Sequence, residues 1–513
     1  MQFERSAGIL LHPTSLPGKY GIGDLGNEAF RFVDFLKNAG QKIWQVFPLG
    51  PTGYGDSPYQ CFSAFAGNPL LVSPDKLMED GFLTKDDLNH PPTSDPAKVD
   101  FGSVINYKKS ILQRAFNNFK KDSNGLEGDF NKFCKAHEEW LDDFSLFMAL
   151  KAYHKGEVWS GWEKGLVHRT PKAINEWTKK LSDEILYHKF VQFNFFRQWK
   201  AVREYTNKAG IKIVGDMPIF IAYDSADLWA NKEEFTVDKA GKLTFIAGVP
   251  PDYFSATGQL WGNPLYKWDL MEKNDFLWWR KRFASLLETV DIIRIDHFRG
   301  FAAYWKIPGG SKTAEPGKWI KAPGEKLFNI VKKHLGDLPI LAEDLGVITP
   351  DVEALRDHFD FPGMKVLQFA FGDGMERKFL PHNFVPNCVV YTGTHDNDTT
   401  KAYFQKEKEK DGGIFEHAQK YLNYFGDDIL TELIRTAYAS VAVFVIIPMQ
   451  DILNLGGEAR MNFPSTLGGN WSWRFTWDQI NENLTKHYYG LANLYERPPG
   501  PKKKEEEIKI EEE

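Results

Sequence analysis

Short apolar segments recur along the chain, and most of them end at a glycine, a proline or a charged residue. Eight of these segments are candidate β-strands: 7–13, 42–50, 212–218, 290–296, 339–346, 364–372, 387–396 and 441–451. Short apolar runs between turn-forming residues are typical of strands that are covered on both faces. The pattern therefore predicts a buried, parallel sheet.

Amphipathic segments lie between several of these strands. In residues 26–40, the apolar Phe30, Val33 and Leu36 fall on one face at helical spacing, and Gly40 is a natural helix stop. Strands that alternate with helices predict parallel βα units. Eight such units fit an α/β fold of the (β/α)8 TIM-barrel type.

The chain is far longer than such a barrel requires. It has 513 residues, whereas a typical barrel has about 250. The surplus lies mainly at about 51–190 and 217–280, after the second and third strands. Because barrel enzymes build their active sites at the C-terminal ends of strands, we expect these insertions to form subdomains around a cleft.

We therefore predict one catalytic barrel domain over residues 1–496. The charged, low-complexity segment 497–513 is predicted to be a disordered tail. No strand-rich segment follows residue 451, so no β-sandwich is expected after the barrel.

Composition narrows the class of protein. The net charge of -6 and the pI near 6.2 argue against nucleic acid as the main partner. No apolar run reaches the roughly 18 residues of a membrane span, and the N-terminus lacks a signal-peptide pattern. The three cysteines form no CxxC pair, so neither disulfides nor zinc are predicted. A cytoplasmic enzyme without a membrane partner is expected.

Charge also appears where an apolar strand should end, in the stretch DIIRIDHFRGF. Side chains alternate along a strand, so Arg294 and Asp296 point one way while Ile293 and Ile295 point the other. In a barrel, the isoleucines would face the helices and the charged pair would face the interior. Taken alone, this pair could equally be a structural ion pair.

Three further acids stand at the C-terminal ends of other predicted strands, namely Asp216, Glu343 and Asp396. Four acids on one rim would repel each other, and such an unfavourable arrangement usually signals a function. A close carboxyl pair suits the cleavage of glycosidic bonds, because a retaining mechanism needs a nucleophile and a proton donor about 5–5.5 Å apart.

The surroundings of the acids suggest their roles. Arg294 should lower the pKa of Asp296 and keep it ionised as the nucleophile. The apolar segment 340–342 precedes Glu343, which should raise its pKa and make it the proton donor. Asp396 remains to hold sugar hydroxyls in the oxocarbenium-like transition state. This chemistry requires no cofactor.

Nine motifs stand in one order over residues 1–496: GILLHPTSLPG, YGIGDLG, GDSPYQ, GVPPDYFS, GQLWGNPLY, RIDHFRGF, AEDLG, THDN and EARMNFP. In this order the chain resembles the 4-α-glucanotransferases (amylomaltases or disproportionating enzymes) of the α-amylase clan. Each motif is short, but together they are specific. The resemblance implies Asp296 as nucleophile, Glu343 as acid/base and Asp396 as transition-state stabiliser, in agreement with the roles inferred above.

The resemblance also implies which residues bind sugar around the point of cleavage: Arg294, Asp216, His395, Tyr59, Ser57 and Asn462. The implied donors are α-1,4-glucans such as maltooligosaccharides, starch or glycogen, and the implied acceptor is another glucan or glucose.

Transfer requires that a sugar hydroxyl outcompete water. Water is present at about 55 M and an acceptor at ~10 mM, so equal competition needs roughly 5 kcal/mol of acceptor binding and water exclusion. In segment 248–264, Tyr253, Phe254 and Trp261 offer stacking faces. The resemblance implies that this segment is a lid, whereas its residues alone fit an ordinary surface loop equally well.

Other interpretations remain open from the sequence. An α-amylase-like hydrolase would use the same acids, and a catalytically silent glucan-binding protein would bind the same sugars without needing the paired acids. Asp396, Asn397 and Asp398 superficially suggest calcium but lack the spacing of an EF-hand loop, so no metal is predicted. The sequence makes no prediction of oligomeric state.

Overall fold

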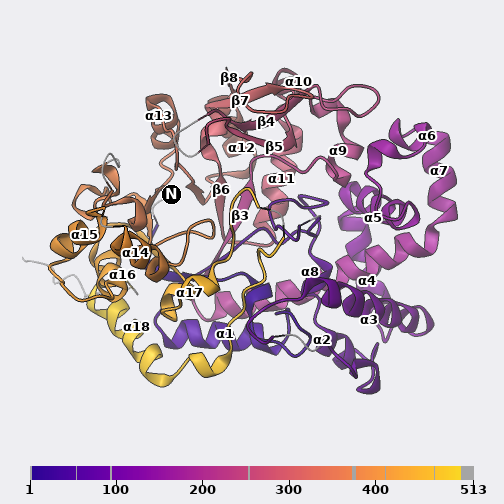
Figure 1. The fold of residues 1–513 in the computed structure, drawn as a ribbon. Coiled ribbons are helices and arrows are strands. Elements are labelled where there is room, and N and C mark those ends of the chain that lie inside the picture. Colours follow the sequence, from indigo (N-terminus) through magenta and orange to yellow (C-terminus); the bar gives the residue numbers. More distant parts are fainter. Residues whose placement is uncertain are drawn as a thin grey trace, which may run out of the picture.

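The computed structural model describes residues 3–497 except 54, 93–94, 252–254, 373–376, 411 and 467. Its centre is a closed barrel of eight parallel strands (Figure 1), joined in the order β1-β12-β11-β10-β9-β6-β3-β2. The strands are β1 (Ser6–Leu10), β2 (Ile43–Val46), β3 (Lys212–Pro218), β6 (Ile292–Asp296), β9 (Ile340–Ala342), β10 (Gly363–Val366), β11 (Cys388–Tyr391) and β12 (Phe444–Pro448). Each overlaps one of the eight predicted segments, so the predicted TIM barrel is confirmed.

Helices follow most of the barrel strands. They are α1 (Asn27–Asn38), α8 (Ser182–Lys208), α11 (Leu277–Leu287), α12 (Gly324–Leu335), α13 (Pro350–His358), α14 (Thr400–Glu409), α15 (Ile414–Leu422), α16 (Leu430–Ala439), α17 (Met449–Ile452) and α18 (Glu482–Leu494). Between β10 and β11 the described residues form only 3-10 turns. The helix predicted over 26–40 is α1, whose Val33 and Leu36 are fully buried.

The first insertion is helical and lies between β2 and α8. It contains α2 (Pro74–Glu79), α3 (Phe101–Lys121), α4 (Glu127–Ala136), α5 (Glu138–Tyr153), α6 (Lys164–Val167) and α7 (Pro171–Lys180). In Figure 1 these purple helices stand to one side of the barrel. The long α8 belongs to both parts, since it packs against α5 of the insertion and against α1 of the barrel layer.

The second insertion contains α9 (Ala226–Ala230), β4 (Phe245–Val249), β5 (Gln259–Pro264) and α10 (Trp268–Lys273). Its two strands join β7 (Ala303–Pro308) and β8 (Lys318–Lys321), which follow β6, in an antiparallel sheet of order β5-β4-β7-β8. The segment with β7 and β8 is a third insertion, which was not predicted from the sequence. β7 pairs with β4, which lies before β6 in the sequence, and local patterns do not reveal such a pairing.

The folded part extends to the last described residue. Arg497, with which the predicted tail begins, is fully buried and donates hydrogen bonds to backbone carbonyls of Tyr438, Ser6 and Ala442. Arg497 therefore belongs to the folded domain, and the rest of the predicted tail lies outside the described residues. After β12, the described residues contain helices and 3-10 turns but no strand. No helix among the described residues has the length and apolar content needed to cross a membrane.

Candidate active site

The first part of the site is a charged cluster on two adjacent strands. The register of β3 and β6 places Asp216 beside Arg294 and Pro218 beside Asp296. Arg294 Nη1 donates to Asp216 Oδ2 at 2.7 Å and to Asp296 Oδ1 at 3.2 Å. The side chains of Arg294 and Asp216 are 4% and 0% exposed. The arginine therefore compensates two carboxylates, and strand geometry fixes all three side chains.

Glu343 lies directly after β9, on the neighbouring strand of the barrel. Its backbone N–H donates to the carbonyl of Ile295 at 3.0 Å, so its main chain is tied to β6. Its carboxyl oxygens accept hydrogen bonds from the backbone N–H groups of His297, at 2.7 Å, and Leu345, at 2.8 Å. His297 has a φ of 53°, a left-handed conformation that turns the chain sharply at the end of β6.

Burial shifts the pKa values of both central acids in the same direction. Burial raises the pKa of Glu343 to about 8, and the negative charge of Asp296 adds to this effect. Burial also raises the pKa of Asp296, although 30% of its side chain is still exposed, while Arg294 opposes that rise. The expectation that Arg294 would hold the pKa of Asp296 below its ordinary value is wrong, because burial outweighs the arginine. Among the described residues, Arg294 donates a hydrogen bond to Asp296 and none to Glu343, so it favours the charged form of Asp296 by direct contact.

An aromatic wall stands beside the charged cluster. The hydroxyl of Tyr59 donates to Asp216 Oδ2 at 2.6 Å and lies 3.4 Å from His395 Nδ1. The rings of Tyr59 and His395 stack with centroids 4.8 Å apart. Ser57 Oγ accepts a hydrogen bond from the backbone N–H of Tyr59 at 3.3 Å. The GDSPYQ segment, predicted to bind sugar through Tyr59 and Ser57, is thereby attached to Asp216.

Asp396 is placed differently from the other acids. It lies in the loop after β11, and half of its side chain is exposed. Asn462 Nδ2 donates to Asp396 Oδ1 at 2.6 Å, and His395 Nε2 is 3.5 Å from the same oxygen. Nearby Asn397 Oδ1 accepts from the N–H and hydroxyl of Thr394, and Asp398 pairs with Lys406. The side-chain oxygens of Asn397 and Asp398 are therefore engaged in hydrogen bonds and an ion pair that stabilise the loop.

A cleft of about 920 Å³ brings most of the predicted residues together. Its lining includes Ser57, Tyr59, Trp261, Asp296, His395, Asp396 and Asn462. Arg294 and Asp216 contact this lining from the barrel interior. Trp261, on β5, packs edge-on against His297 with ring centroids 4.7 Å apart. Tyr253 and Phe254 lie outside the described residues.

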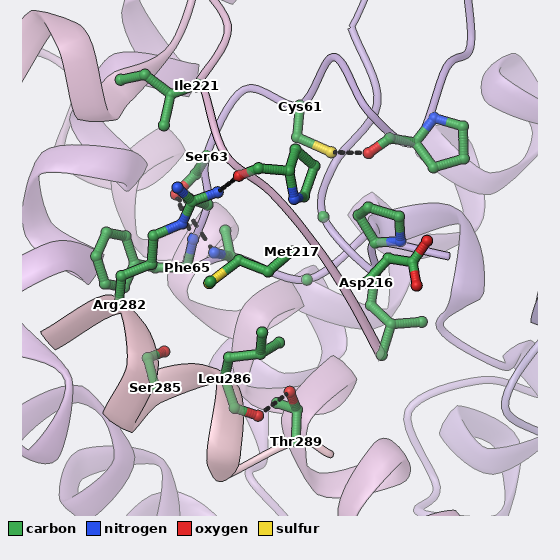
Figure 2. A pocket seen from close by; sticks show the side chains of 18 of the residues that line it. Cys61, Ser63, Phe65, Asp216, Met217, Ile221, Arg282, Ser285, Leu286 and Thr289 are labelled. Atoms are coloured by element: carbon green, nitrogen blue, oxygen red, sulfur yellow. Dashed lines mark hydrogen bonds between the residues drawn. The ribbon is translucent and has the colours of Figure 1, made fainter. Parts of the chain in front are cut away.

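A second cavity of about 720 Å³ lies next to the cleft, and Tyr59, Pro218 and Phe220 line both. Figure 2 shows its wall, with Asp216 and Met217 from β3 and Arg282 from α11. Arg282 is buried and donates to the carbonyl of Ile219 at 3.1 Å. This cavity is lined by β3, α8, α11 and the chain that follows β2, and its arginine binds the chain that leaves β3.

Sequence reasoning missed several polar and aromatic neighbours of the acids. Gln45 Nε2 donates to Asp216 Oδ1 at 3.2 Å, and the Tyr391 hydroxyl donates to Gln45 Oε1 at 2.8 Å. Trp471 lines the cleft, with its ring centroid 5.7 Å from that of Tyr59. A polar Gln45 within the apolar run IWQV was a usable signal, whereas Trp471 gave none that distinguished it from a core residue.

Comparisons with known proteins agree with this geometry. A family model described as 4-alpha-glucanotransferase matches residues 11–480. The chain belongs to this family. The 4-alpha-glucanotransferase of Synechocystis is 52% identical, over 96% of this chain and 98% of its own, and that of Thermus thermophilus is 48% identical, over 97% and 100%.

Solved structures place the fold in the same family. The amylomaltase from Streptococcus agalactiae, solved in complex with acarbose, aligns with a TM-score of 0.93 at 41% identity, over 96% of this chain and 100% of that one. The amylomaltase of Corynebacterium glutamicum, at 18% identity and a TM-score of 0.77, shares the fold. The resemblance stated from the motifs is confirmed, and the chain is an enzyme of the 4-alpha-glucanotransferase family.

Proposed function

We propose that this enzyme transfers α-1,4-glucan segments by a retaining double displacement through a covalent intermediate on Asp296. The observation that carries the proposal is the pair of carboxyl groups on adjacent strand ends, of which Asp296 contacts Arg294 whereas Glu343 has a pKa raised to about 8. One group is thereby suited to attack and the other to donate a proton near neutral pH.

In the first step, the Asp296 carboxylate attacks the anomeric carbon while Glu343 gives its proton to the departing glycosidic oxygen. The glycosidic bond breaks, an ester forms on Asp296, and the free glucan end leaves as an alcohol. In the second step, Glu343, now a carboxylate, takes the proton from the 4-hydroxyl of the acceptor. That oxygen attacks the anomeric carbon and releases Asp296, which restores the α-configuration.

The residues around the pair would hold the sugar ring during both steps. Asp396 and His395 line the cleft beside Asp296, where their polar groups can meet ring hydroxyls. The buried Asp216–Arg294 pair and Tyr59 form the support beneath. Hydrogen bonds from such groups strengthen as charge develops at the anomeric carbon. They therefore stabilise the transition state more than the bound substrate.

The β4–β5 hairpin would act as the lid. Trp261 reaches the cleft wall from β5. Gly258, directly before β5, has a φ of +68°, and a Cβ there would approach the carbonyl oxygen of Val249 to 2.4 Å, so the chain requires glycine where it enters β5. A fixed hairpin that carries an aromatic ring can bind the acceptor and exclude water, which supplies part of the roughly 5 kcal/mol that transfer needs.

Maltooligosaccharides, starch and glycogen are the proposed donors, with glucan or glucose as acceptor. The related enzymes named 4-alpha-glucanotransferase and the acarbose-bound amylomaltase support this substrate class. Incubation of the purified protein with maltotriose tests the proposal. A ladder of longer and shorter glucans is expected. Release of small sugars without a ladder would indicate an α-amylase-like hydrolase instead.

A further inference from the structure

Asp396 is the acid that the barrel strands hold least. It lies several residues beyond the end of β11, its side chain is half exposed, and it has no ion pair with an arginine or lysine side chain within the described part of the chain. A carboxylate on a loop can point in many directions, and a catalytic group must be held close to its productive position. The orientation of Asp396 therefore depends on what restrains its loop.

Arg460 supplies such a restraint from the loop after β12. Its Nη2 donates to the backbone carbonyl of Asp396 at 2.8 Å, and its Nε donates to the backbone carbonyl of Asn462 at 2.8 Å. Its guanidinium lies over the ring of Phe463, 4.1 Å from the centroid. Its Nη1 is 4.0 Å from Asp398 Oδ2. Only 17% of the arginine side chain is exposed.

The two carbonyls that Arg460 binds belong to the two residues whose side chains meet. Asn462 Nδ2 donates to Asp396 Oδ1 at 2.6 Å, so the main chain of each partner is held by one guanidinium while the side chains contact each other. A guanidinium presents its donors in a rigid, planar fork, which suits two carbonyls at a fixed separation. A lysine ammonium in its place would reach one of them as a point charge.

We propose that Arg460 is a positioning residue for transition-state stabilisation, which acts by fixing Asp396 and Asn462 relative to each other and to the cleft. It touches neither the scissile bond nor the two acids of the covalent step. This assignment rests on the proposed function, because it gives Asp396 the role of holding sugar hydroxyls in the transition state.

The loop of Asp396 has restraints that do not involve Arg460. Asn397 Oδ1 accepts a hydrogen bond from the backbone N–H of Thr394. Gln368 Nε2 donates to the carbonyl of Asp398 at 3.0 Å, and Lys406 forms an ion pair with the Asp398 carboxylate. The loop should therefore fold without the arginine and lose chiefly the placement of Asp396. That expectation separates a positioning role from a purely structural one.

The test replaces Arg460 by Gln and by Lys and measures maltotriose disproportionation. We expect Arg460→Gln to lower kcat by roughly 10- to 100-fold, the scale of a small misplacement of a catalytic group, with KM within about threefold. Arg460→Lys should recover little of the loss, since it cannot bridge both carbonyls. If Arg460→Gln does not fold, Arg460→Lys carries the test.

Arg5 offers a matched control at the opposite end of the barrel. It precedes β1 and donates to three backbone carbonyls, those of Tyr495, Ala442 and Tyr438, at 3.2–3.3 Å. Arg5→Gln should lower Tm at least as much as Arg460→Gln but leave kcat within about twofold of the parent. Equal losses of kcat in the two variants would assign Arg460 to general stability and overturn the proposal.

A double-mutant cycle with Asp396→Asn decides whether Arg460 acts through Asp396. If it does, adding Arg460→Gln to Asp396→Asn should lower the rate by less than about threefold, because coupled residues are not additive. The same fold-loss in both backgrounds, or a change in KM alone, would refute the assignment. Absence of a product ladder from the parent enzyme would instead refute the proposed function.

Discussion

The proposed active site has two halves that are built by different means. The first half, Asp216, Arg294, Asp296 and Glu343, stands on or directly after barrel strands and is held by backbone register and a buried ion pair. The second half, centred on Asp396 with Trp261, is carried by a loop and a hairpin on the rim. Covalent chemistry needs fixed distances, which strands provide, whereas a polymer substrate needs a rim that can admit and enclose it.

The two halves also differ in electrostatics. In the strand half, burial raises the pKa of both Asp296 and Glu343, and Arg294 opposes the shift at each. In the rim half, the Asp396 carboxylate keeps contact with solvent and takes its hydrogen bond from a neutral amide. The surroundings in the strand half therefore shift the pKa values of Asp296 and Glu343, whereas those in the rim half determine where the Asp396 carboxylate lies.

The largest effect should come from Asp296→Asn, which removes the proposed nucleophile from the strand half. The amide keeps the size of the side chain, so the fold should persist while the transfer rate falls by on the order of 10⁴-fold or more. The measurement is maltotriose disproportionation together with Tm. Mass spectrometry of enzyme treated with a slow fluorinated glycosyl donor should locate the adduct on Asp296, and an adduct on another carboxylate would contradict the assignment.

Glu343→Gln should follow, with a loss of roughly 10²- to 10⁴-fold from the removal of the proposed general acid. The parent enzyme should lose activity as pH rises through about 8, because Glu343 donates a proton only while it is protonated. In Glu343→Gln this alkaline limb should disappear from the residual activity. Its persistence in the variant would assign the titration to another group.

The same substitution should raise stability at neutral pH. The folded-state pKa of Glu343, about 8, lies above the ordinary value of 4.5, so the folded state binds more protons between these values and loses stability as pH rises across them. Glutamine removes this cost. We expect Tm of Glu343→Gln to exceed that of the parent at pH 8 and to differ less near pH 5, and a lower Tm at pH 8 would argue against a strained carboxyl group.

Sequence reasoning succeeded best for the strand half. Alternation along 290–296 predicts that Arg294 and Asp296 share one face, because a period of two is a local property of any strand. In the fold, this face meets Asp216. Sequence reasoning failed for the direction of the pKa shift of Asp296, because the alternation shows the arginine but not the depth of burial. The barrel was predicted from eight short apolar runs that alternate with amphipathic segments.

The rim half was harder to predict from residues alone. Arg460 lies in the EARMNFP motif, but the two backbone carbonyls that it binds, those of Asp396 and Asn462, flank β12 in the sequence. No local sequence pattern predicts such a pair of contacts. From its residues alone, the β4–β5 hairpin fitted a surface loop equally well. The strand β7, which pairs with β4, comes only after β6 in the sequence. Long-range antiparallel pairing and arginine-to-carbonyl contacts appear only once the chain is folded.

Tyr59→Phe tests how the first insertion is attached to the strand half. The change removes the 2.6 Å hydrogen bond to buried Asp216, while Gln45 and Arg294 still contact that carboxylate. Loss of one hydrogen bond to a charged group corresponds to roughly 10- to 150-fold in kcat/KM. The assay is the initial rate with maltotriose below KM. An unchanged kcat/KM would show that the ring, by stacking on His395, suffices without the hydroxyl.

The smallest effect should come from Trp261→Ala in the rim half, and it should alter the fate of the intermediate more than its formation. Without the indole, water reaches the covalent intermediate more easily, so the ratio of transfer to hydrolysis should fall by about 3- to 10-fold. The measurement compares glucan redistribution with the release of new reducing ends. Leu260 is the matched control, because it neighbours Trp261 on β5, points to the opposite face and is 37% exposed. Leu260→Ala should leave the ratio unchanged, and an equal change in both variants would mean that the hairpin, rather than the ring, excludes water.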